Sequence, residues 1–206
     1  MRALAAALAA GLLLSACAPA TDGEGDATAT GGAGRVADVD TPQLRKLKAT
    51  TDVPPCEPGP GDPVDGGLPD LTLPCLGGGE EVNLGSLRGP MVVNLWATWC
   101  PPCRKELPIY EQFHERYGDR VAVLGVDFND QHPAGALEMA RTAGTSYPQL
   151  ADPGTRLIGP LLAPSDGLPI HLFVDRDGRL VHREAVEIRS LGQLEELVAE
   201  HLEVEL

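Results

Sequence analysis

The sequence lacks an excess of basic residues: 16 Lys and Arg stand against 30 Asp and Glu, and the formal net charge of the 206 residues is −14. Binding to nucleic-acid phosphates depends on clustered Lys and Arg, and the sequence contains no such patch or stripe. Nucleic acid is therefore not an expected partner. The acidity instead favours solubility and, among proteins, basic partners.

The apolar run near the N-terminus is too short to cross a membrane, because a spanning helix needs about 20 apolar residues. Ala3–Leu14 has 12 residues and follows Arg2, as in the apolar region of a secretory signal peptide. The run ends in Leu14-Ser15-Ala16-Cys17, which resembles the lipobox of bacterial lipoproteins. We expect residues 1–16 to be a signal peptide and Cys17 to carry a lipid that anchors the chain to the extracytoplasmic side of the cell membrane. The alternative is an ordinary signal peptide followed by a chance cysteine.

Aromatic residues make up only 4% of the chain, and none lies between Ala18 and Asp40. Ala, Thr, Gly and Asp dominate this stretch, which cannot bury enough apolar surface to fold. Thr41–Ala49 could form a short helical turn, whereas Thr51–Pro69 is interrupted repeatedly by Pro and Gly. We therefore expect residues 17–67 to form a flexible, lipid-anchored linker and residues 68–206 to form one domain.

Beyond Leu68 the apolar pattern alternates between strands and helices. Met91–Trp96 is apolar except for Asn94, which is typical of a central buried strand. Pro101–Tyr117 has an apolar helical face, a Pro at its first position and a Gly after its last. The other expected strands are 71–73, 81–84, 121–127, 170–174 and 180–186, and the other expected helices are 133–143, 155–162 and 191–202. This order predicts an α/β fold with a central mixed β-sheet flanked by helices.

Two of the five cysteines form a C-x-x-C at the junction of the central strand and the first long helix. The first sulfur, on Cys100, would lie at the helix N-terminus, where unpaired amides and the helix dipole favour a thiolate. The thiolate is the attacking species in disulfide exchange. Cys103, one turn later, could then attack the mixed disulfide and release the partner. The pair is thus predicted to be the catalytic centre.

Cys56 and Cys75 remain unassigned. In an extracytoplasmic compartment disulfides persist, and the even number suggests a structural disulfide worth about 3 kcal/mol. The alternative is a second redox pair, although neither cysteine lies at a helix start that would acidify it. A zinc site is disfavoured, because two prolines separate Cys100 from Cys103 and the other two cysteines lack a matching short spacing.

Several motifs resemble the thioredoxin superfamily, most closely the TlpA/ResA/DsbE branch of membrane-tethered thiol reductases. From about Leu68 to the C-terminus, the matching segments are Val93-Asn94-Leu95-Trp96-Ala97, Trp99-Cys100-Pro101-Pro102-Cys103, Arg104-Lys105-Glu106-Leu107-Pro108, Gly167-Leu168-Pro169 and Phe173-Val174-Asp175. The resemblance implies a thioredoxin-like fold, with an N-terminal extension here, and a cis Pro169 facing the cysteines. It also implies that the backbone before Pro169 pairs with an extended partner segment. Trp99, Leu168 and Pro169 are therefore candidate substrate-binding residues.

The same resemblance bears on proton transfer. Asn94 stands where thioredoxin carries a buried Asp that assists proton transfer from the second cysteine, and an amide cannot do so. Glu106, three residues after Cys103, lies on the same side of the helix. Related tethered reductases have an acidic residue there. We hypothesise that Glu106 accepts or tunes the proton of Cys103; the alternative is a solvated Glu that the helix dipole favours.

These features predict an extracytoplasmic thiol–disulfide oxidoreductase that needs no metal and no cofactor beyond the redox-active disulfide Cys100–Cys103. Pro101 and Pro102 lack N–H donors for the Cys100 thiolate, which favours a reductase over an oxidant. The resemblance implies exported protein disulfides as substrates, such as apocytochromes c awaiting haem, and a membrane thiol as electron donor; we expect a monomer. One alternative is an oxidant or isomerase of secreted proteins. Another is a copper-binding or copper-delivery module using the two cysteines and His171.

Overall fold

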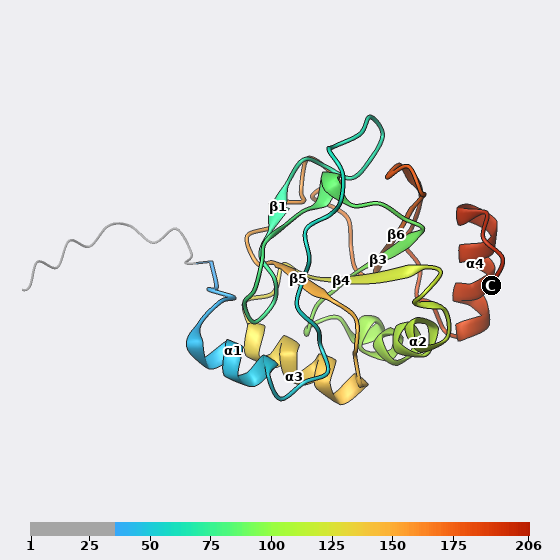
Figure 1. Ribbon diagram of the computed structural model, residues 1–206. Helices are drawn as coiled ribbons and strands as arrows, with labels where there is room; N and C mark the ends of the chain where they lie inside the picture. Colours follow the sequence, from blue (N-terminus) through green and yellow to red (C-terminus); the bar gives the residue numbers. More distant parts are fainter. Residues whose placement is uncertain (1–35) are drawn as a thin grey trace, which may run out of the picture. The chain divides into compact units, whose positions relative to one another are not determined.

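The computed structural model describes residues 36–206 (Figure 1), so the expected signal peptide and Cys17 lie outside the described residues. A five-stranded sheet with the order β5-β4-β3-β6-β7 forms the centre. Its strands are β3 (Met91–Trp96), β4 (Ala122–Phe128), β5 (Gln149–Asp152), β6 (Ile170–Val174) and β7 (Leu180–Glu184). β4 runs parallel to β3 and to β5, whereas β6 is antiparallel to β3 and to β7. The expected mixed sheet is confirmed.

The helices cover one face of this sheet. They are α1 (Pro42–Lys48), α2 (Pro101–Tyr117), α3 (Pro133–Ala143) and α4 (Leu191–Leu202). Along β3, Val92 and Trp96 pack with buried helix residues, whereas Met91, Val93 and Leu95 pack with the N-terminal hairpin and loop residues. Alternate residues of a strand point to opposite faces, so the helices lie on one side and the hairpin on the other, as Figure 1 shows. None of the helices in residues 36–206 is long and apolar enough to span a bilayer.

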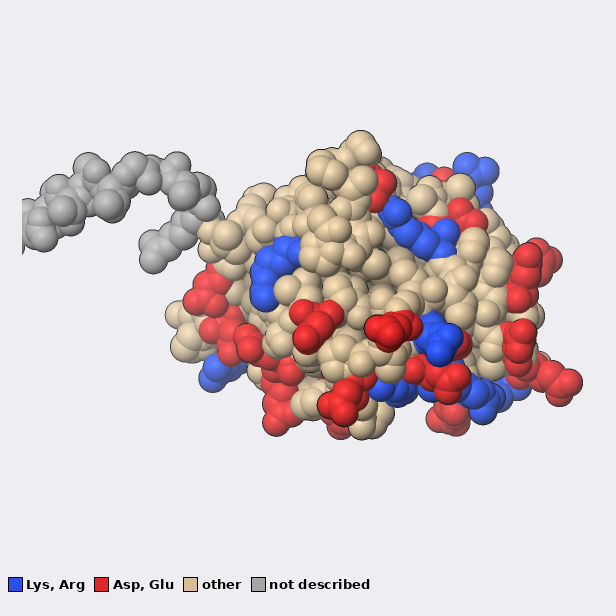
Figure 2. All heavy atoms as spheres, turned by 90° about the horizontal axis from the view of Figure 1, so that it is seen from above, with Lys and Arg blue, Asp and Glu red and all other residues tan. Residues whose placement is uncertain are grey.

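The hairpin on the other face is small. β1 (Thr72–Leu73) pairs antiparallel with β2 (Val82–Asn83), and the 3-10 helix η1 (Leu84–Ser86) follows. Between the strands, Gly77, Gly78 and Gly79 all have positive φ, a conformation that side-chain-bearing residues rarely adopt. On the face shown in Figure 2, Lys and Arg lie scattered among Asp and Glu and form no basic patch.

The segment before residue 68 is folded onto the domain, contrary to the expected linker. Thr41 caps α1 by accepting a hydrogen bond from the Leu44 amide, and Val39, Leu44, Val53 and Cys56 are buried. A Cβ on Gly78 would lie 2.2 Å from Asp40 Oδ1, and Gly78 has a φ of +90°, so a glycine suits the close approach of the Asp40 side chain to the turn. The Pro and Gly residues between 51 and 69 prevent regular structure there, but they do not prevent packing.

Two further expectations were wrong. Residues 155–162 form turns rather than a helix, because Gly159 has a φ of +98° and the Asp152 carboxylate accepts the amides of Arg156 and Leu157. Conversely, the edge strand β5 was not expected, because Gln149–Asp152 is short and polar at both ends. Its Gln149 side chain accepts a hydrogen bond from Trp96 Nε1 at 2.9 Å, which satisfies the buried indole.

Candidate functional site

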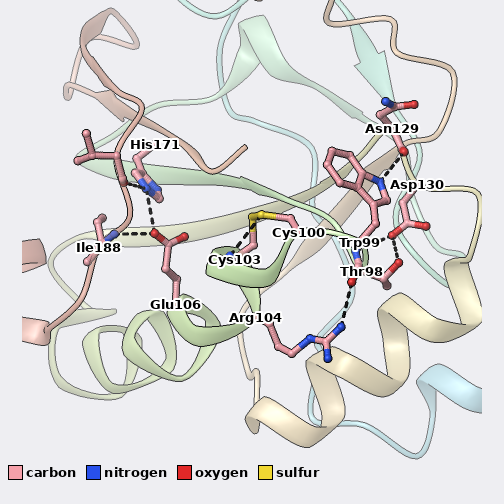
Figure 3. Close-up of a disulfide and its surroundings, with 11 residues drawn as sticks. Thr98, Trp99, Cys100, Cys103, Arg104, Glu106, Asn129, Asp130, His171 and Ile188 are labelled. Atoms are coloured by element: carbon pink, nitrogen blue, oxygen red, sulfur yellow. Dashed lines mark hydrogen bonds and ion pairs between the residues drawn. A yellow bond between two sulfur atoms is a disulfide. The ribbon is translucent and has the colours of Figure 1, made fainter. Parts of the chain in front are cut away.

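Cys100 and Cys103 form a disulfide at the start of α2, with their Cα atoms 5.4 Å apart (Figure 3). Cys100 is the N-cap residue of the helix, and the Cys103 amide donates to Cys100 Sγ at 3.3 Å. Because Pro101 and Pro102 have no N–H, this amide is the first donor that the helix can offer to the sulfur. Both cysteines are buried, with Cys100 only 2% exposed. A thiolate on Cys100 would thus be held by one amide and the helix dipole.

The loop between β3 and Cys100 is held by Asp130, in the segment after β4. The Asp130 carboxylate accepts from the amide and the hydroxyl of Thr98 and from the His132 amide. Burial alone would raise the pKa of Asp130, but these hydrogen bonds outweigh it and hold the pKa below its usual value. An ionised Asp130 therefore positions the residues that lead into the nucleophile.

Sequence reasoning missed Asp130. The available signal was its place just beyond the end of β4, since the carboxyl ends of parallel strands meet at one edge of a sheet. Asp127, one residue before that end, faces Trp96 in the β3–β4 register and is buried. Neither of its oxygens has a hydrogen-bond partner among residues 36–206, and burial together with the nearby Asp130 charge raises its pKa well above the usual value. Two carboxyl groups with opposite protonation tendencies therefore lie behind the active loop.

Trp99 lies at the rim of the site and is 52% exposed. Its indole Nε1 donates to the Asn129 carbonyl at 2.9 Å, which fixes the ring beside the cysteines. On the other side of the loop, Arg104 donates to the Thr98 carbonyl at 3.2 Å (Figure 3). An exposed aromatic side chain with a fixed orientation is a suitable contact for a partner protein.

The Leu168–Pro169 peptide bond is cis, as the resemblance to thioredoxins implies. Leu168 packs against the cluster of buried residues that contains Cys100 and Cys103. The structure therefore brings the segment before β6 to the same core cluster as the cysteines, although some 65 residues separate them along the chain.

Glu106 is completely buried on the inner side of α2, so the alternative of a solvated surface residue is wrong. Its Oε1 accepts from the Ile188 amide at 2.6 Å and lies 3.5 Å from His171 Nε2. Its Oε2 is buried without a hydrogen-bond partner in the described part of the chain. Figure 3 shows the carboxyl group on the same side of the helix as Cys103.

His171 does not offer a free nitrogen to a metal. Nε2 lies 3.0 Å from the Val186 carbonyl, and Nδ1 lies 2.7 Å from the Tyr110 hydroxyl. Because a carbonyl can only accept, Nε2 carries a proton, and Nδ1 is paired with the Tyr110 hydroxyl. Burial, with a smaller contribution from Glu106, raises the pKa of Tyr110 well above its usual value, so the hydroxyl remains a donor. Asn94, opposite His171 in the β3–β6 register, is also buried.

The other two cysteines form a second disulfide, with their Cα atoms 5.8 Å apart. It joins the coil after α1 to the segment after β1, where Cys75 makes an antiparallel bridge with Leu150 of β5. Lys48 Nζ lies 3.0 Å from Cys75 Sγ. This bond is thus built into the core away from the helix N-terminus that holds the first disulfide.

Comparison with known proteins gives the family. Residues 64–183, more than half of the chain, match the AhpC/TSA family. The chain belongs to this family. Among its relatives, the thiol-disulfide oxidoreductase ResA of Bacillus cereus is 29% identical over 107 residues, which cover 51% of this chain and 60% of ResA. The thiol:disulfide interchange protein DsbE homolog of Paracoccus denitrificans is 32% identical over 141 residues, 63% of this chain and 73% of that protein.

A solved structure supports the fold of this AhpC/TSA family member. The exposed lipoprotein thioredoxin Etrx1 of Streptococcus pneumoniae superposes with a TM-score of 0.53 at 22% identity, over 64% of this chain and 99% of that one. The fold is therefore thioredoxin-like, and the resemblance drawn from the sequence motifs is confirmed. The match to ResA spans only three fifths of that relative's length.

Proposed function

We propose that this chain is an extracytoplasmic thiol–disulfide oxidoreductase that reduces disulfides in exported proteins. The observation that carries the proposal is the Cys100–Cys103 disulfide at the N-terminus of α2, with the Cys103 amide directed at Cys100 Sγ. Membership of the AhpC/TSA family and the activities that the names of ResA and the DsbE homolog state support it. The reduced Cys100–Cys103 pair would supply the electrons for this reaction without a further cofactor.

In the proposed reaction the reduced enzyme transfers two electrons. The Cys100 thiolate attacks one sulfur of the substrate disulfide, a mixed disulfide forms, and the other substrate sulfur leaves as a thiolate. Cys103 then loses its proton and attacks Cys100 Sγ, which releases the substrate as a dithiol and leaves Cys100–Cys103 oxidised. A membrane thiol donor would restore the reduced pair.

Glu106 is the proposed acceptor of the Cys103 proton. Its helical position, three residues after Cys103, supports this role, as does its Oε2, which has no hydrogen-bond partner within residues 36–206. Its other oxygen is tied to the Ile188 amide, which orients the carboxyl group. A buried carboxylate with one free oxygen can take up a proton without losing its structural hydrogen bond.

The proposed substrate contacts are Trp99, Leu168 and Pro169. An extended segment of the substrate would pair with the backbone before Pro169, and the exposed face of Trp99 would cover its side chains. The expected lipid on Cys17 would keep the domain near its membrane electron donor. Apocytochromes c, which need reduced cysteines to bind haem, are the substrates that we propose.

The reduction potential of the Cys100–Cys103 pair tests the direction of electron flow. It should be measured on the full chain by equilibration with glutathione, with mass spectrometry following Cys100–Cys103 separately from the second disulfide. A value near or below about −220 mV, in the range of thioredoxins and glutaredoxins, is expected for a reductase. A value near about −120 mV, as in strong periplasmic oxidants, would overturn the reductase and favour oxidation of secreted proteins. Stoichiometric copper binding that Cys100→Ser abolishes would instead favour the copper module.

A further inference from the structure

The second disulfide is in contact with a cation. Lys48 Nζ lies 3.0 Å from Cys75 Sγ and 3.1 Å from the Gly78 carbonyl, and the Lys48 residue is 9% exposed. A disulfide sulfur is a weak acceptor, so it contributes little to holding a desolvated ammonium. Burial lowers the pKa of Lys48, an effect that the more distant Asp40 only partly offsets. The ammonium would gain a strong partner if the Cys75 sulfur became a thiolate.

The position of Lys48 is determined by the glycine turn. A Cβ on Gly77 would lie 3.0 Å from Lys48 Cβ, and Gly77 has a φ of +75°. α1 therefore lies directly against the turn that follows Cys75, and the Lys48 side chain is directed along it to the sulfur. Asp40, just before this helix, is paired with Arg45 at 2.8 Å through its Oδ2. The geometry thus leaves Lys48 facing Cys75.

The two sulfurs of this bond are held differently. Around Cys75, the backbone is tied to β5 by hydrogen bonds from Leu76 to Gln149 and from Ala151 to Pro74. Around Cys56, residues 54–59 include three prolines and make no backbone–backbone hydrogen bond within residues 36–206. Cys56 also lines a cavity of about 340 Å³, together with Pro54, Pro55, Glu57, His114 and Gly118. Cys75 does not line this cavity, so a thiol that enters it would meet Cys56 first.

We propose that Cys56–Cys75 is a second redox site, at which an external thiolate attacks Cys56 and Cys75 leaves as a thiolate paired with the Lys48 ammonium. The new sulfur–sulfur bond forms on Cys56 as the Cys56–Cys75 bond breaks, and the electron pair of that bond goes to Cys75 Sγ. If the reductant is a dithiol, its second thiol attacks the mixed disulfide, frees Cys56 and leaves the reductant oxidised by two electrons. The substrate class is a thiol or dithiol reductant, and reduction would release the coil after α1 from the core. This site goes beyond the proposed function, which needs only Cys100 and Cys103.

The test uses the full chain with Cys17, Cys100 and Cys103 replaced by Ser, so that the second disulfide is the only one and the result does not depend on the first site. Reduction by dithiothreitol at pH 7 is followed by alkylation and mass spectrometry. We expect Lys48→Met to slow the reduction about tenfold, which corresponds to about 1.4 kcal/mol in the barrier. Lys48→Arg, which keeps the charge, should stay close to the parent rate, and Lys46→Met, on the exposed side of α1, is the matched control.

A second measurement identifies the attacked sulfur. Brief exposure to glutathione followed by acid quenching should give an adduct on Cys56, and this result remains decisive if Lys48→Met fails to fold. An adduct on Cys75, equal rates for the parent and a folded Lys48→Met, or a parent that is reduced only as fast as it unfolds would each overturn the proposal.

Discussion

The two disulfides of this chain lie next to different positively polarised groups: a backbone amide at a helix N-terminus and a lysine ammonium. Cys100–Cys103 spans three residues at a helix N-terminus, and its stabilising group is a backbone amide that the helix leaves unpaired. Cys56–Cys75 joins residues 19 positions apart. Cys56 lies in the coil after α1, Cys75 pairs with Leu150 of β5, and the neighbouring charged group is the Lys48 ammonium. The first environment is local in sequence, whereas the second exists only because α1 packs against the Gly77–Gly79 turn.

This difference distinguishes two contributions that a disulfide can make, one to redox chemistry and one to the stability of the fold. The Cys100–Cys103 disulfide closes a small loop and restricts the unfolded chain less than the other disulfide does. Its main contribution is therefore to redox chemistry. The longer bond fastens the segment before residue 68 to the domain, so its removal should cost more stability. Each property can be removed separately.

The largest expected effect is loss of turnover at the first site. Cys100→Ser should reduce dithiol-driven insulin reduction to the uncatalysed rate, because the thiolate at the helix N-terminus is lost and Cys103 is fully buried. Cys103→Ser should accumulate a mixed disulfide on Cys100 that mass spectrometry detects. The double variant Cys56→Ser, Cys75→Ser should retain turnover. The distinction between the two bonds would fail if turnover required the second pair.

The second-largest effect is on stability. Here the Cys56–Cys75 disulfide should matter more than Cys100–Cys103. Replacing Cys56 and Cys75 by Ala should lower the free energy of unfolding by about 3 kcal/mol, whereas replacing Cys100 and Cys103 by Ala should lower it by about 2 kcal/mol. Chemical denaturation of the oxidised proteins measures both. Equal losses would mean that loop length does not explain the difference.

A third prediction concerns the transfer of the Cys103 proton to Glu106, a step proposed only for the Cys100–Cys103 site. Glu106→Gln should slow reduction at pH 7 on the order of 10²-fold and shift the pH–rate profile, because the amide cannot accept the Cys103 proton. Glu111→Gln is the matched control: Glu111 is also a buried carboxylate on α2, but it accepts from Ser146. An unchanged profile for Glu106→Gln, with unfolding no different from the control, would reject the role.

The smallest effect concerns the carboxyl pair behind the first disulfide. The raised pKa of Asp127 means that the folded protein binds its proton more tightly than the unfolded chain does. Its contribution is therefore fully present below pH about 4 and is lost as pH rises toward the folded pKa. Asp127→Asn should gain stability over the parent as pH rises from 4 to 7, measured by urea unfolding.

The pH dependence that Asp130 gives to stability is opposite to that of Asp127, so Asp130 serves as the comparison. Its lowered pKa contributes stability above its unfolded value near 3.8, and that contribution is lost as pH falls through the folded pKa. Asp130→Asn should therefore cost stability at neutral pH, with the cost shrinking in acid. Parallel pH curves for the parent and both variants would contradict this account of the pair.

Most of the fold could be predicted from the sequence. The strands are largely apolar, and the helices have clear start and stop residues. Met91–Trp96 and Pro101–Tyr117 agree with the structure to the residue. β5 could not be predicted, because its stability comes from pairing with β4 and from the Gln149–Trp96 hydrogen bond rather than from its own pattern. The folded segment before residue 68 was missed for a related reason, since its few apolar residues are buried singly against distant partners.

By itself, the sequence determined the features that depend on neighbours along the chain. Examples are the cysteine at a helix start, the missing donors at Pro101 and Pro102, and the helical side shared by Cys103 and Glu106, all of which follow from local backbone geometry. Only the tertiary structure decided the contacts between distant segments: Asp130 with Thr98, Glu106 with Ile188, and Lys48 with Cys75. The physical reason is that hydrogen bonds and charges act over a few ångströms, and packing alone determines which distant residues come that close.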